Sequence, residues 1–105
     1  MTPKYRNRRT GKYDSKKEAA RAAELQILAK IGKIEDLVEQ PEYVLIPKQQ
    51  GERAIKYKAD FQFFDKELGK TIVEDVKSAF TRKLPVYRMK KKLMKYMLGI
   101  EVVEI

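Results

Sequence analysis

The chain has 105 residues, of which 43% are hydrophobic and 37% charged, and its formal net charge is +9. This length and composition are typical of one small globular domain, and the positive charge indicates a polyanionic partner. The absence of cysteine and histidine excludes disulfides, thiolate zinc sites and imidazole chemistry, so a metal would need oxygen ligands, as Mg²⁺ or Mn²⁺ does.

Residues 1–13 form a basic arm without an acid, and Arg6, Arg8 and Arg9 in it are candidate DNA contacts. The alternative is a solvated tail. The arm is polar and unlike a secretory signal, and no apolar run approaches the roughly 20 residues of a membrane span. We therefore expect no membrane association and an intracellular, cytoplasmic location.

The first predicted element is a helix over residues 16–31, because Ser15 suits an N-cap, Glu18 follows three residues later and Gly32 suits the stop. Glu18 heads an apolar stripe that should face a sheet. It is thus a candidate site acid, although it could simply return a hydrogen bond to the Ser15 backbone. Two lysines in the first turn are candidate DNA contacts, Lys16 and Lys17.

Three strands are predicted next, over residues 42–46, 53–64 and 71–77, after an ambiguous stretch at 34–38. The second strand alternates cleanly between apolar and polar residues, which places Asp60 on its polar face.

The third predicted strand places Asp75 and Lys77 on one face and Glu74 on the other, because side chains alternate along a strand. A carboxylate beside an ammonium group is an arrangement suited to a metal and a base. Glu74 is assigned a structural or auxiliary role, and Gln40, at the edge of the first strand, is a second auxiliary candidate. Asp60, Asp75 and Lys77 could instead form a surface ion pair of little energetic value.

A basic loop over residues 78–83, a helix over 85–98 and a last strand over 100–105 complete the prediction. The helix has no acidic residue to offset its positive charges, which favours a phosphate-facing surface over a merely solvated one. The candidate DNA contacts here are Arg82, Lys83, Arg88, Lys90 and Lys91.

The predicted α-β-β-β-α-β order, with Glu18 on the first helix, Asp60 on the second strand and Asp75-Val76-Lys77 on the third, resembles the PD-(D/E)XK nuclease superfamily. Ala59 stands where the superfamily motif has proline. The chain is also similar to small phage proteins filed as a domain of unknown function. That similarity rests on the sequences Asp14–Glu18, Glu39–Pro41, Ala59–Phe61, Val73–Lys77 and the basic helix Tyr87–Tyr96.

The resemblance implies a restriction-endonuclease-like α/β domain over residues 1–105, with a mixed sheet flanked by helices, and a Mg²⁺-dependent endonuclease that resolves Holliday junctions in recombination. It implies that Asp60 and Asp75 bind the metal, that Glu18 completes the site, and that Lys77 orients or deprotonates the attacking water. For a phage-encoded protein the location would be the host cytoplasm.

A four-way junction has two-fold symmetry and the chain has one candidate site, so we expect a homodimer. Other readings remain: a nicking or packaging-linked nuclease, a non-catalytic DNA-binding module, or an RNA-binding or ribosome-associated protein.

Overall fold

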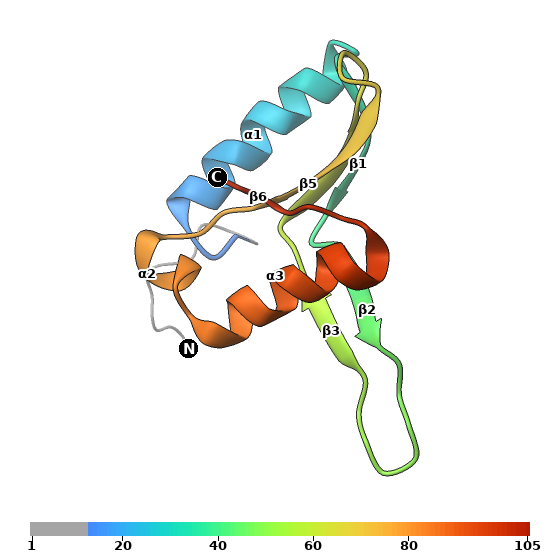
Figure 1. The fold of residues 1–105 in the computed structure, drawn as a ribbon. Helices are drawn as coiled ribbons and strands as arrows, with labels where there is room; N and C mark the ends of the chain where they lie inside the picture. Colours follow the sequence, from blue (N-terminus) through green and yellow to red (C-terminus); the bar gives the residue numbers. More distant parts are fainter. Residues whose placement is uncertain (1–12) are drawn as a thin grey trace.

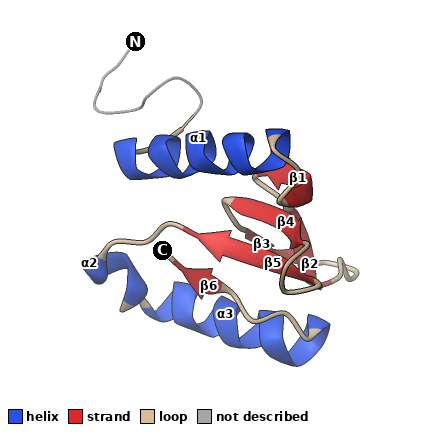
Figure 2. Ribbon diagram, turned by 90° about the horizontal axis from the view of Figure 1, so that it is seen from above, coloured by secondary structure: helices blue, strands red, loops and turns tan. Residues whose placement is uncertain are grey.

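The computed structural model describes residues 13–105, and in it two helices enclose a mixed sheet (Figures 1 and 2). The elements in chain order are α1 (Lys16–Lys30), β1 (Ile34–Glu39), β2 (Glu42–Ile46), β3 (Ile55–Lys58), β4 (Phe61–Asp65), β5 (Lys70–Asp75), α2 (Ala79–Arg82), α3 (Pro85–Leu98) and β6 (Val103–Glu104). The main sheet has the order β1-β4-β5-β6, antiparallel except for the parallel pair β5-β6. The predicted α/β class, with a mixed sheet flanked by helices, is confirmed.

Both long helices begin and end at the residues whose chemistry predicts it. Ser15 accepts a hydrogen bond from the Glu18 N–H at 3.1 Å, so it caps α1. Pro85 is the first residue of α3, and Gly99 follows its end with φ +68°, a left-handed conformation that glycine adopts easily. No helix within residues 13–105 combines the length and the apolar content needed to cross a membrane.

The hydrophobic core lies in two parts, one against each helix. On the α1 side, Leu25 and Phe61 are fully buried beside Ala22, Ile34 and Phe63. The part on the α3 side contains Leu45, Tyr57, Ala59, Val73, Tyr87, Met94 and Val102. Because β5 contributes residues to both parts, its alternating side chains point to opposite helices, and this divides Glu74 from Asp75.

The prediction of one strand over residues 53–64 is wrong. The chain breaks at Ala59-Asp60 into β3, which pairs with β2 in a separate two-stranded sheet, and β4, which joins the main sheet. The β1–β2 segment, which pairs with β4 and β3, is interrupted at the matching position, because Gln40 and Pro41 separate β1 from β2. The Ala59 N–H donates to the Pro41 carbonyl at 3.0 Å, and the Gln40 N–H donates to the Asp60 carbonyl at 2.8 Å. The bend arises because Gln40 has φ +57° and Pro41 lacks an N–H for a ladder.

Three smaller differences concern segments next to the core. The ambiguous stretch at 34–38 is strand β1, which pairs with β4. The basic loop predicted over 78–83 contains the short helix α2, capped by Ser78. The last strand, predicted over 100–105, is only the two-residue β6, because only Val103 and Glu104 pair with β5, and the residues before them connect α3 to this strand (Figure 1).

Candidate active site

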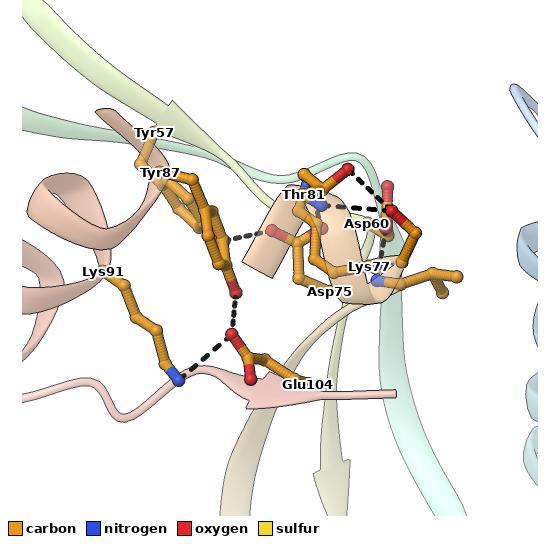
Figure 3. A network of polar contacts seen from close by, with 10 residues as sticks. Tyr57, Asp60, Asp75, Lys77, Thr81, Tyr87, Lys91 and Glu104 are labelled. Carbon is orange, nitrogen blue, oxygen red and sulfur yellow. Dashed lines mark hydrogen bonds and ion pairs between the residues drawn. The ribbon is translucent and has the colours of Figure 1, made fainter. Parts of the chain in front are cut away.

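The carboxyl end of β5 places Asp75 beside Lys77, as Figure 3 shows. The Lys77 Nζ lies 3.6 Å from the Asp75 Oδ1. Asp75 is only 1% exposed, and its Oδ2 accepts a hydrogen bond from the Tyr57 hydroxyl. Its backbone is tied to the neighbouring segment, because the Ile105 N–H donates to the Asp75 carbonyl at 2.9 Å. An ammonium group therefore faces a carboxylate that is shielded from water.

Asp60 comes from the bend between β3 and β4 and is fixed against the same stretch of chain. Its Oδ2 accepts a hydrogen bond at 2.7 Å from the N–H of Val76, the residue between Asp75 and Lys77. Its own N–H donates to the Glu74 carbonyl at 3.1 Å. The break that interrupts the predicted strand is thus what brings Asp60 to the end of β5.

The pKa of Asp75 reflects this crowding. The pKa of the Asp75 carboxyl is raised to about 7, first by burial and then by hydrogen bonding and charge from the neighbouring Asp60 carboxyl. The hydrogen bond from Tyr57 and the charge of Lys77 act in the opposite direction. Ionised Asp75 is therefore costly in its buried position, and a divalent cation bound to it would remove that cost.

Glu18 reaches the same region from the first turn of α1. It is 4% exposed, and burial raises the pKa of its carboxyl, with further increases from the charges of Asp60 and Asp14. The positive charge of Lys77 lowers the pKa of Glu18. The charges of Asp60 and Lys77 thus act on Glu18, and the four side chains predicted for the site come from α1, the β3–β4 bend and the end of β5.

The oxygen chemistry of this cluster fits a hard divalent cation. Glu18 Oε2 and Asp75 Oδ1 are both buried and have no hydrogen-bond partner. Residues 13–105 contain no ready-made group of three acidic, histidine or cysteine side chains placed to hold a metal. Mg²⁺ commonly takes only one or two carboxylates and keeps several waters. The residues that fit it are therefore the pair Asp60 and Asp75, with the buried Glu18 as a further acid.

The two auxiliary candidates support the site from outside it. Glu74, 3% exposed, points toward α1 and accepts hydrogen bonds from Arg21 at 2.8 and 2.6 Å. This pairing raises the pKa of the Arg21 guanidinium. Gln40 is exposed and contacts Asp60 through its backbone N–H. Both residues thus act on the backbone or packing around Asp60, and their auxiliary role in the site stays a prediction.

Sequence analysis missed two tyrosines that complete the site, since both read as apolar contacts. Tyr57 donates to Asp75, and Tyr87 donates to Glu104 Oε2 at 2.7 Å. The two rings lie 6.4 Å apart, and Lys77 Nζ lies 5.1 Å from the centroid of the Tyr87 ring. Burial raises the pKa of both hydroxyls, which keeps them protonated as donors. The available signal was the hydroxyl itself, because a buried tyrosine O–H needs a hydrogen-bond partner.

The basic residues predicted to contact DNA occupy two regions of the described chain. Lys16 and Lys17 are exposed on the first turn of α1. Arg82 and Arg88 are exposed on α2 and α3, together with Lys83 between these helices, whereas Lys90 and Lys91 are partly buried. Arg6, Arg8 and Arg9 lie outside residues 13–105. Positive charge therefore lies on both helical layers that border the carboxylate cluster, which consists of Glu18, Asp60 and Asp75.

Comparison with known proteins identifies one family. A family model described as "Protein of unknown function (DUF1064)" matches residues 4–102 of the chain. Neither the curated proteins nor the solved structures include a significant match.

Proposed function

Because the chain belongs to the DUF1064 family, whose description assigns no activity, we propose its function from the chemistry of the site: a Mg²⁺-dependent endonuclease that hydrolyses phosphodiesters in DNA. The observation that carries the proposal is the pairing at the end of β5, where Lys77 faces buried Asp75 and the N–H of Val76 holds Asp60 beside them. Among the supporting contacts, Lys77 Nζ lies 3.6 Å from a buried Asp75 oxygen that has no hydrogen-bond partner.

Each residue of the cluster has a role that its surroundings support. Asp60 and Asp75 would hold the ion, with Glu18 acting through a bound water or a second ion. When bound, the ion would supply positive charge to the scissile phosphate and make a coordinated water more acidic. Lys77 would donate hydrogen bonds to the charge that develops on the phosphate, or hold the attacking water. Val76 would keep Asp60 in place through its N–H, which already donates at 2.7 Å.

We propose branched DNA, and a four-way junction in particular, as the substrate. The net charge of +9 and the cations on α1, α2 and α3 favour a phosphate backbone as the partner. The branched substrate follows from the resemblance to junction-resolving endonucleases. Symmetric cutting of such a junction needs two sites, so the active species would be a homodimer with one site in each subunit.

Two observations favour a second candidate function, a non-catalytic nucleic-acid-binding module on the same fold. Residues 13–105 have no complete set of three acidic, histidine or cysteine ligands for a metal, and burial raises the pKa of the Asp75 and Glu18 carboxyls, which disfavours their charged forms. A module of this kind would bind DNA or RNA through its cations.

Cleavage of a labelled four-way junction with Mg²⁺ tests the proposal. The wild type should produce symmetric nicks, whereas Lys77→Ala should bind the junction and lose cleavage by about a hundredfold or more. Lys70→Ala is the matched control, since this exposed lysine lies at the opposite end of β5. A wild type that binds without cutting in Mg²⁺ or Mn²⁺ would support the non-catalytic module, and full activity of Lys77→Ala would refute the assigned role.

A further inference from the structure

A second basic region, separate from the carboxylate cluster, is hollowed into a pocket. It has a volume of about 320 Å³ and lies among α2, α3 and the chain that leads into β6. Its lining includes five cationic side chains, Arg82, Arg88, Lys91, Lys92 and Lys95. Four of these stand at spacings of three and four residues along α3, so they share one face of the helix.

Carboxylates in the lining satisfy only some of these cations. Glu104 is 3.3 Å from Lys91 and 3.9 Å from Arg82, and it also accepts the hydrogen bond from Tyr87. The second carboxylate of the lining, Glu101, lies 3.6 Å from Lys95, and both side chains of this pair are exposed.

Arg88 and Lys92 form no ion pair within residues 13–105, and they are neighbours at i and i+4, where like charges repel. An anion placed between them would remove this repulsion.

Tyr87 lies between the pocket and the candidate active site. The face of the Tyr87 ring lies 5.1 Å from Lys77 Nζ, and its hydroxyl donates to Glu104, which lines the pocket (Figure 3). Tyr87 and Glu104 thus connect Lys77 to the pocket, and a strand bound at Lys77 could continue along them to the pocket cations.

We infer that this pocket binds a backbone phosphate of the strand that is cut, close to the scissile phosphodiester; the inference rests on the proposed nuclease function. Guanidinium and ammonium groups are the donors that phosphate oxygens accept most strongly. Among residues 13–105, no aromatic side chain lines the pocket to stack a base. Recognition there is thus of the backbone, and it is independent of base sequence.

The test is the salt dependence of DNA binding by Arg88→Gln/Lys92→Gln. Binding of a fluorescein-labelled four-way junction and of a matched duplex is followed by anisotropy in EDTA over a series of salt concentrations. Losing the contact to this one phosphate should reduce the slope of log K against log[salt] by about 1, and should weaken binding about tenfold or more at low salt. Both DNAs should be affected alike, because the contact carries no sequence information.

Two further proteins make the result specific. Lys30→Gln/Lys33→Gln removes the same charge from exposed positions at the far end of α1, and it should keep a nearly wild-type slope. Arg88→Lys/Lys92→Arg should restore the slope. Thermal unfolding of all variants establishes that each is folded before binding is measured.

The outcomes separate this inference from the proposed nuclease. Cleavage by the Lys30→Gln/Lys33→Gln control should keep the wild-type rate, since neither lysine is assigned to the site or to DNA binding. A slope equal to that of the Lys30/Lys33 control overturns the pocket inference, even if the wild type cuts DNA. If the wild type never cuts DNA but the salt slope still falls in Arg88→Gln/Lys92→Gln, the nuclease proposal is overturned and the pocket remains a phosphate site.

Discussion

Replacing Asp75 by asparagine should make the metal-free protein more stable at about pH 8, and the gain should disappear near pH 4. The reason is the pKa of Asp75, which is about 7 in the folded chain against an ordinary 3.8. The folded state therefore binds this proton more tightly than the unfolded state. The stability that the proton contributes is complete below about pH 4 and is lost as the pH rises through about 7. Asparagine is neutral at every pH, and its oxygen can still accept from Tyr57.

The size of the effect follows from the same two values. The ordinary pKa of 3.8 and the folded value of about 7 differ by about three pH units, and each unit corresponds to about 1.4 kcal/mol. The advantage of the variant in unfolding free energy should therefore widen by up to about 4 kcal/mol from pH 4 to pH 8. Urea unfolding followed by circular dichroism in EDTA, at several pH values, measures it.

The control is Glu101→Gln, because Glu101 is an exposed carboxylate. Its stability difference from the wild type should stay within about 0.5 kcal/mol throughout. A constant or narrowing advantage of Asp75→Asn with rising pH would refute the reasoning about this carboxyl. Under the proposed function, Mg²⁺ takes the place of the proton, so saturating Mg²⁺ should stabilise the wild type at about pH 8 and hardly affect Asp75→Asn.

Two further substitutions test how the surroundings of the site are held. Arg21→Met should cost about 3 kcal/mol in urea unfolding, because it leaves the buried Glu74 carboxylate without its partner; Arg21→Met/Glu74→Leu should recover most of the loss, and a double variant as unstable as the single one would contradict this account. Tyr57→Phe should cost about 1–2 kcal/mol at pH 8 by removing the donor to ionised Asp75. Its cost should be smaller near pH 4, where the carboxyl is protonated, and an equal loss at both pH values would be inconsistent with the hydrogen bond.

Local chemistry allowed the two long helices and the direction of the β5 side chains to be predicted. The ends of α1 are marked by Ser15 and Gly32, and those of α3 by Pro85 and Gly99. These ends were predictable because caps and breakers act over a few residues. Strand alternation separated Glu74 from Asp75, since that period is a property of any strand. The chain alone therefore identified which polar side chains could face one another.

Only the tertiary structure decided where those side chains meet. Nothing in the alternation of residues 53–64 marks the break at Asp60, which arises from hydrogen bonds to Gln40, Pro41 and β5, far away in sequence. The pairing of Tyr57 with Asp75, like that of Arg21 with Glu74, also joins distant segments. A sequence therefore determines periods, caps and charges, whereas the distances that make acids, an amine and tyrosines into one site depend on how the sheet bends and which helix covers each face.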